Sequence, residues 1–135
     1  MLTKNRRALE VIEAAATLPV MLLILVSLVN LGFAVFAHQA VQNAAAYGAR
    51  MGSVAQDCRA CAAYSAASGA VAGSLVRNAN VEVLAPGGTV GSVLKIRVTG
   101  EVPNLMGPLM ALNGGGGGGG PIVVSAEATF RAEGW

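Results

Sequence analysis

The hydrophobic pattern of the chain is dominated by one uninterrupted apolar run, Ala14–Ala37, which contains no charged residue. As a helix this run would be about 36 Å long, enough to cross a hydrocarbon core of about 30 Å. Lipid offers the backbone no hydrogen-bond partner, so a segment that spans it must satisfy its own N–H and C=O groups. The run therefore predicts a single transmembrane helix.

The helical pattern continues beyond the apolar run, from Leu9 at one end to Val54 at the other. The stretch after Ala37 contains no proline, and small residues recur in it at every fourth position. These small residues are Ala40, Ala44, Gly48 and Gly52. Their spacing places them in one stripe on which another helix can pack closely. Glycine costs a helix about 1 kcal/mol relative to alanine, so two glycines favour a packing role over chance.

Beyond this helix the pattern predicts a second, short helix and then a sheet. The short helix is expected over Ala62–Arg77, with its end at Asn78–Asn80. Residues 81–85 and 92–102 flank a Pro-Gly-Gly turn and are expected to form a hairpin. In the second of these runs, apolar Leu94, Ile96 and Val98 alternate with polar Lys95, Arg97 and Thr99. Such alternation indicates a strand with one buried face and one solvated face.

A third alternating run follows a segment of unusual composition. Pro103–Leu112 is apolar but contains two prolines, and it is expected to form a loop or short helix over the sheet. Gly114–Gly120 are expected to be a flexible linker within a Gly-rich loop at 113–120. The run from Ile122 to Glu133 then supplies another strand. A small antiparallel sheet of three to four strands is therefore predicted.

Together these elements predict an α+β protein in which a long transmembrane helix continues into a small exported domain. The expected boundaries are a cytoplasmic leader over 1–8, the transmembrane and extended helix over 9–56, and the exported domain over 57–135. This orientation follows from the basic residues of the leader, because Lys and Arg next to a span stay on the cytoplasmic side. Those residues are Lys4, Arg6 and Arg7. The net charge of +2 is too small to indicate a nucleic-acid partner.

Cys58 and Cys61 are the two cysteines, and both lie on the exported side in this topology. In an oxidising compartment a close pair readily forms a disulfide, here expected at a turn between helices. Haem attachment is excluded because Ala62 follows the second cysteine, and a zinc site would need more ligands than His38 offers. A reactive thiol–disulfide pair stays open as an alternative. The sequence holds no Ser–His–Asp set and no phosphate loop, so we expect no enzyme and no cofactor.

Polar residues and a proline modify the span itself. Pro19 lacks a backbone donor and is expected to kink the helix or break it locally. Ser27 and Asn30 lie deep in the span and are expected to form hydrogen bonds with another helix, or to be simply tolerated there, and not to be catalytic. A signal peptide cut after Ala37 is the competing interpretation, but the apolar run is long for one. Nor would a signal peptide need Glu10 ahead of its apolar run, where a second acid, Glu13, also stands.

The N-terminal stretch resembles type IV-like prepilins, and most closely the TadE/TadG-like pseudopilins of the tight-adherence pilus system. In that family a basic leader ends in a small residue, a Glu follows at the fifth mature position, and an early Leu-Pro opens the apolar helix. Here Ala8 holds the small position, Glu13 lies five residues on, and Leu18-Pro19 follows. The resemblance continues through Gln39–Ala55 and, in outline, the C-terminal strand ending at Glu133.

The resemblance implies processing and assembly rather than catalysis. A prepilin peptidase would cut between Ala8 and Leu9, and Glu13 would pair with the N-terminal amine of a neighbouring subunit. The chain differs from the family pattern in having Ala where Gly is usual and in carrying Glu10 as a second acid. The implied function is a structural or assembly component of the bacterial inner membrane, whose partners are other pilin-like subunits and pilus assembly proteins. The alternatives are an exported thiol–disulfide protein using Cys58 and Cys61, or a binding domain released after Ala37.

Overall fold

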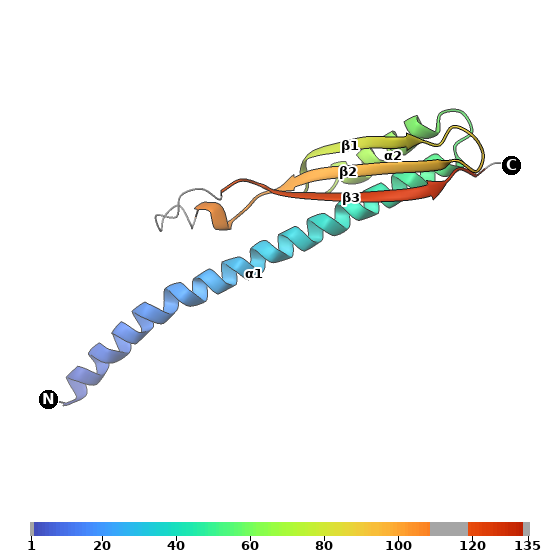
Figure 1. Cartoon of the computed structure of the whole chain (residues 1–135). Coiled ribbons are helices and arrows are strands. Elements are labelled where there is room, and N and C mark those ends of the chain that lie inside the picture. Colours follow the sequence, from blue (N-terminus) through green and yellow to red (C-terminus); the bar gives the residue numbers. More distant parts are fainter. Residues whose placement is uncertain (1, 109–118, 134–135) are drawn as a thin grey trace. The chain divides into compact units, whose positions relative to one another are not determined.

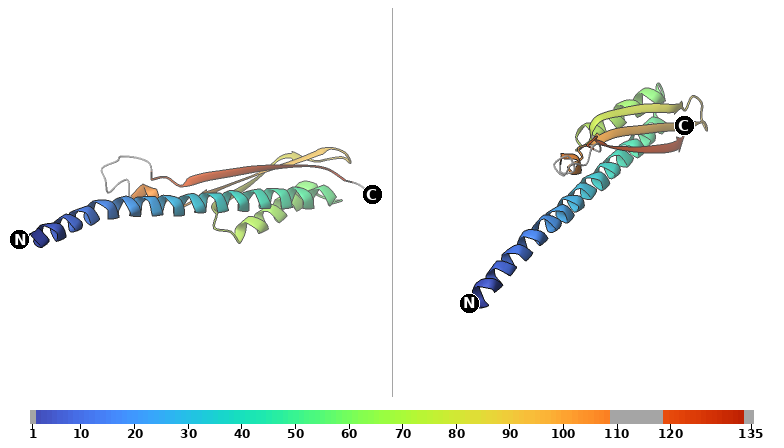
Figure 2. Two further views of the ribbon diagram at one scale, coloured as in Figure 1. Left: turned by 90° about the horizontal axis from the view of Figure 1, so that it is seen from below. Right: turned by 60° about the vertical axis from the view of Figure 1, so that its left-hand side comes forward.

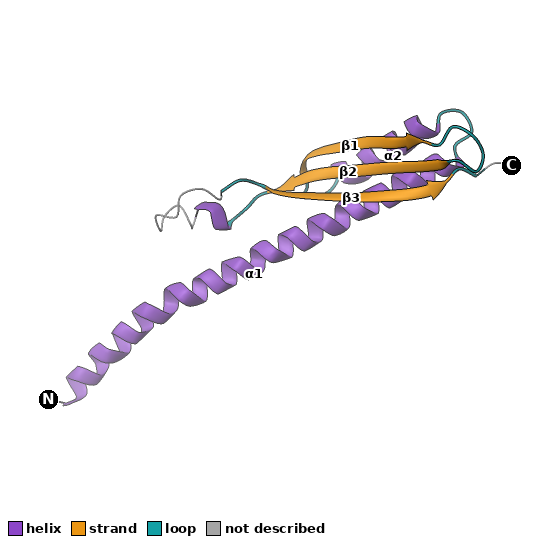
Figure 3. Ribbon diagram, viewed as in Figure 1, coloured by secondary structure: helices purple, strands orange, loops and turns teal. Residues whose placement is uncertain are grey.

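The structure is a computed structural model that describes residues 2–108 and 119–133, with side chains from residue 10 onward (Figure 1). A long helix is followed by a short helix and then by three strands (Figure 3). In chain order these elements are α1 (Leu2–Val54), α2 (Arg59–Ala72), β1 (Arg77–Pro86), β2 (Val93–Val102) and β3 (Ile122–Arg131). The predicted α+β class, with its long apolar N-terminal helix and small antiparallel sheet, is confirmed.

The chain divides into two compact units. The first combines the described residues of Met1–Gly32 with those of Leu105–Gly119, and the second combines Phe33–Asn104 with those of Gly120–Trp135. Helix α1 contributes to both units because it runs without interruption from one into the other.

Within the first unit, α1 carries a nearly continuous apolar surface that the described residues leave uncovered. Apart from Val26, its large hydrophobic side chains are 44–71% exposed from Val11 to Leu31. By length and composition it is the one helix in the described part of the chain that could cross a membrane. The helix is continuous through Pro19, so the predicted local break is absent. Nearby, the Thr17 hydroxyl donates a hydrogen bond of 3.0 Å to the Glu13 carbonyl oxygen.

The second unit is built around a three-stranded antiparallel sheet in which β2 lies between β1 and β3. Every second residue of β2 is buried, as the alternation of Leu94, Ile96 and Val98 predicts. The ladder between β2 and β3 is regular along its whole length, whereas that between β1 and β2 has two register shifts. The apolar face of the sheet is therefore set chiefly by β2.

Helices α1 and α2 pack against this apolar face (Figure 2). The helices contribute mostly alanines to the core, and the sheet contributes branched side chains. The buried set is Ala37, Val41, Ala44, Ala45, Ala49, Ala63, Ala67, Val71, Leu94, Ile96, Val98, Val102 and Val124. Since alanine side chains are short, this core requires the two helices to approach each other and the sheet closely.

Two sequence predictions about the connecting segments are wrong. Helix α2 ends at Ala72 with Gly73 as its cap, and the residues from Arg77 to Asn80 belong to β1 instead of ending the helix. The segment expected to cover the sheet as a loop or short helix does contain a helical turn at Met106–Pro108, but from Leu105 to Pro108 it belongs to the first unit with α1. Its remaining residues, and most of the Gly114–Gly120 linker, lie outside the described residues.

Candidate functional site

The acidic residues at the start of the apolar run share one face of α1. Glu10 and Glu13 are both exposed, and a separation of three residues makes them neighbours on a helix. Glu13 immediately precedes the apolar run. Ala8 and Leu9 lie in the helical backbone of α1, and their side chains are outside the described part.

The small-residue stripe of α1 faces α2 of the same chain. A Cβ atom added at Gly48 would lie 2.6 Å from the Cβ of Ala67 and 2.7 Å from the carbonyl oxygen of Ala63. At Gly52 it would lie 2.6 Å from the Cβ of Ala63 and 2.8 Å from the carbonyl oxygen of Arg59. Neither position therefore has room for a side chain.

The other residues of the stripe, and the residues of α2 that face the stripe, also have short side chains. Ala44 is buried and Ala40 is half-buried. The facing helix presents a stripe of its own, also spaced by four residues: Ala63, Ala67 and Val71, all buried. The sequence analysis identified the stripe on α1 but not the matching stripe on α2. The α2 stripe has the same four-residue spacing in the sequence, but in so alanine-rich a stretch this spacing also arises by chance.

The cysteine pair forms a disulfide at the start of α2. Cys58 and Cys61 are bonded, with Cα atoms 5.2 Å apart, so the predicted disulfide is present. Cys58 is the N-cap of α2 in an extended conformation, and the N–H of Cys61 donates to its Sγ at 3.2 Å. Both residues are exposed. The bond thus links the N-cap of α2 to the first turn of that helix, directly after the turn that leads from α1.

Arg59, which the sequence analysis did not single out, connects three distant parts of the second unit. Its guanidinium Nη1 donates to the carbonyl oxygens of Gly87 at 3.4 Å and Gly88 at 3.1 Å. Its Nη2 donates to the carbonyl oxygen of Glu133 at 3.3 Å. The start of α2 is thereby attached to the turn between β1 and β2 and to the segment after β3. The partners are main-chain atoms, which leave no signal in the sequence.

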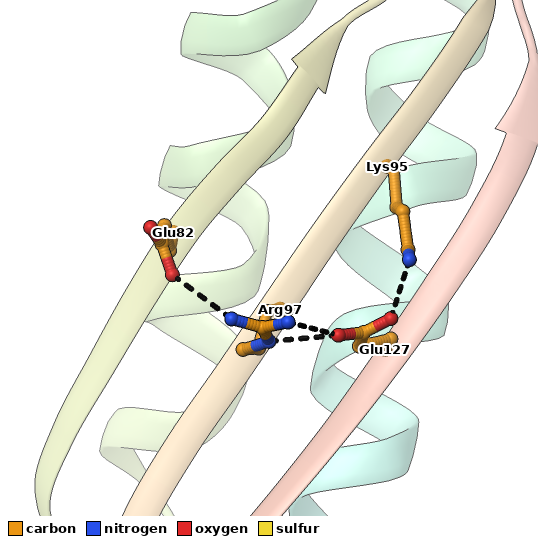
Figure 4. A network of polar contacts seen from close by, with 4 residues as sticks. All are labelled: Glu82, Lys95, Arg97 and Glu127. Carbon is orange, nitrogen blue, oxygen red and sulfur yellow. Dashed lines mark hydrogen bonds and ion pairs between the residues drawn. The ribbon is translucent and has the colours of Figure 1, made fainter.

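The solvated face of the sheet carries a network of four charges, one from β1, two from β2 and one from β3 (Figure 4). Glu127 lies 2.6 Å from the Lys95 Nζ and accepts hydrogen bonds from Arg97, which is also 3.6 Å from Glu82. Hydrogen bonds from Lys95 and then Arg97 lower the pKa of Glu127 below its ordinary value. Such exposed pairs contribute little to stability, and this face has the character of a solvated surface.

Polar residues of the span contact the segment that follows β2. The main-chain N–H of Leu105 donates to the Oδ1 of Asn30 at 3.1 Å. The Ser27 hydroxyl donates to the carbonyl oxygen of Leu23 at 2.7 Å and lies 3.5 Å from the sulfur of Met106. Leu105 directly precedes the short helical turn of Met106–Pro108, so these contacts of Asn30 and Ser27 are made with another helical segment of the same chain.

Comparison with known proteins gives a family match over part of α1. Residues 11–50 match the family model of TadE-like proteins. This match covers Glu13, Pro19, the apolar run and most of the small-residue stripe, so the predicted resemblance is confirmed. No curated protein and no solved structure matches the chain. The sheet and the disulfide lie outside the matched residues.

Proposed function

We propose that this chain, a TadE-like protein over residues 11–50, is a pseudopilin-like structural or assembly component of a tight-adherence type pilus or a related secretion apparatus. The observation that carries the proposal is that the matched residues coincide with the uncovered apolar surface of α1. A surface of this size needs lipid or other apolar helices as its environment. The protein would act by helix packing instead of catalysis.

In the membrane, α1 would be a single-pass anchor. The basic residues Lys4, Arg6 and Arg7 favour a cytoplasmic N-terminus, which would place the second unit on the exported side. The disulfide between Cys58 and Cys61 is consistent with that side, because disulfides persist in oxidising compartments. The inner membrane of a bacterium, with the second unit in the periplasm, is the location that fits both features.

Glu13 would be the residue that determines how subunits align. Cleavage by a prepilin peptidase between Ala8 and Leu9 would make Glu13 the fifth residue of the mature chain and expose a new amine. Pairing of that amine with Glu13 of a neighbouring subunit would neutralise a carboxylate at the border of the lipid. An acidic residue left unpaired at the centre of a span costs about 3 kcal/mol or more, and less near its edge. The pairing would therefore favour one register between adjacent helices.

We expect Glu13→Ala to abolish most pilus assembly while leaving membrane insertion intact, because the substitution removes the paired carboxylate but no apolar surface. Assembly is measured as the pilus protein in the sheared surface fraction, and insertion as resistance to carbonate extraction. Glu10→Ala is the matched control, since Glu10 is also exposed and lies three residues away. Unchanged assembly in Glu13→Ala, or equal losses in both variants, would contradict the role given to Glu13.

An exported thiol–disulfide protein is the second candidate, favoured by one observation: the cysteine pair is exposed and Cys58 caps a helix. Cysteines at helix N-termini are often reactive in exchange chemistry. Under the pseudopilin proposal the bond is instead a structural link.

The variant Cys58→Ser/Cys61→Ser separates the two candidates. We expect it to keep pilus assembly and to lower the free energy of unfolding by about 2 kcal/mol, the chain-entropy value for so short a loop. Urea unfolding followed by circular dichroism measures the stability. Loss of assembly at a temperature where the variant is still folded would favour the thiol–disulfide function.

A further inference from the structure

The contact between Asn30 and Leu105 lies well inside the apolar run of α1. Asn30 is seven residues before Ala37, the last residue of that run, which corresponds to a depth of about 10 Å along the helix. At this level the neighbouring leucines of α1 are largely exposed: Leu28 by 63% and Leu31 by 61%. The N–H of Leu105 reaches the same level, because it donates to the Asn30 side chain.

The segment that makes this contact is itself apolar. From Leu105 to Pro108 it contains no charged or polar side chain, and the flanking residues from 103 to 112 add one asparagine and no charge. Leu105 is 40% exposed, and the Met106 sulfur lies against Ser27 of the span. In the second unit, β2 ends at Val102 before this connection, and β3 begins at Ile122 after it. Leu105 thus presents an apolar side chain and has its backbone donor satisfied by the helix.

We propose that Leu105–Pro108 is a second lipid-contacting element, which docks on the span at Asn30 and lies in the outer half of the bilayer. The inference rests on the proposed function, because it requires α1 to be in the membrane. Met106–Pro108 form a helical turn, and the N–H of Leu105 directly ahead of it needs an acceptor within the protein at membrane depth. Asn30 supplies that acceptor, which gives a physical reason for an amide in an otherwise apolar helix.

Lipid is favoured over a neighbouring subunit as the environment of this segment for two reasons. The segment is held by its own chain, so its position does not depend on a partner. The exposed residues at its level of α1 are leucines, which suit lipid, whereas helix pairs in membranes favour small residues that allow close approach.

Quenching of tryptophan fluorescence by spin-labelled lipid tests the proposal. The full chain carrying Trp135→Phe is reconstituted in phosphatidylcholine vesicles with doxyl groups at a shallow or a deep acyl position. A single tryptophan is then introduced as Leu105→Trp, as Leu28→Trp in the span, or as Val90→Trp. Val90 is 68% exposed in the turn between β1 and β2, at the end of the sheet opposite to Val102. Met106→Trp provides a second probe of the segment.

We expect Leu105→Trp and Met106→Trp to lose most of their emission with shallow doxyl lipid, as Leu28→Trp does, and Val90→Trp to lose none. Adding Asn30→Leu should release the segment and restore the Leu105→Trp emission, whereas Asn30→Gln should keep the quenching. Quenching of Leu28→Trp without quenching of either segment probe overturns this inference and leaves the anchor standing. No quenching at any of these positions overturns the anchor as well. Quenching that persists in Asn30→Leu overturns the docking on Asn30.

Discussion

Replacing Gly48 with alanine is expected to lower the free energy of unfolding of the second unit by about 1–3 kcal/mol, the usual cost of overpacking a filled core. The added methyl group would lie 2.6 Å from the Cβ of Ala67 and 2.7 Å from the carbonyl oxygen of Ala63. Neither atom belongs to a flexible side chain, so the two helices would have to move apart. Urea unfolding of the full chain in detergent micelles, followed by circular dichroism, measures the loss.

Gly69→Ala is the matched control for Gly48→Ala. Gly69 lies in α2, and nothing is within 4 Å of the position that its Cβ would take. The same substitution there should stabilise the protein by up to about 1 kcal/mol, because alanine is the better helix former. Opposite signs for the two variants would show that close packing, not helix propensity, requires glycine at position 48. A stabilising Gly48→Ala would contradict the contact between α1 and α2.

The stripe also shows how far spacing alone can predict packing. Small residues at every fourth position indicate that a helix approaches closely, and in the structure one does. Spacing says nothing about which helix that is, because neighbouring subunits and the same chain offer equivalent surfaces. The structure places α2 on Gly48 and Gly52, so this part of the stripe is already covered within the chain. Subunit packing would then depend on the apolar part of α1 that precedes it.

The sheet was more predictable than the second helix for a physical reason. In β2 every second residue is buried and the others are half-buried or exposed to solvent, so apolar and polar side chains alternate clearly. Around α2 the sequence is rich in alanine both inside the helix and in the residues that flank it. The ends of α2 are therefore hard to locate from the hydrophobic pattern. The C-cap Gly73 has an ordinary negative φ of −86°, so the backbone there does not require glycine, whereas Asn78, with a positive φ of 49°, lies in β1.

The contacts that sequence reasoning missed are those made by main-chain atoms far away along the chain. Arg59 donates to three carbonyl oxygens, and Asn30 accepts from the N–H of Leu105. A main-chain partner has no residue type, so neither contact produces a motif or a period. Of the contact between Asn30 and Leu105, the sequence shows only the unusual residue, which is a polar amide within an apolar span. That anomaly led to the right residue in α1 but did not reveal which segment of the chain supplies the partner.

Leu94→Ala is expected to destabilise the second unit by about 2–5 kcal/mol, the range for truncating a buried leucine. Leu94 is fully buried in β2 and approaches both Gly52 of α1 and Gly87 in the turn after β1. Neither glycine has a side chain that could fill the cavity, which favours the upper half of that range. Val93→Ala is the control on the same strand: Val93 is 48% exposed and should cost about 1 kcal/mol or less.

The same leucine offers a test of how the sheet and α1 meet. A Cβ atom at Gly52 would lie 2.6 Å from the Cδ2 of Leu94, so Leu94→Ala removes one of the obstacles to Gly52→Ala. We therefore expect Gly52→Ala to cost less in the Leu94→Ala background than in the wild type. The relief should be partial, because the Cβ of Ala63 and the carbonyl oxygen of Arg59 remain close. Residues in contact couple in such double-mutant cycles, so purely additive losses would contradict the packing of Leu94 against Gly52.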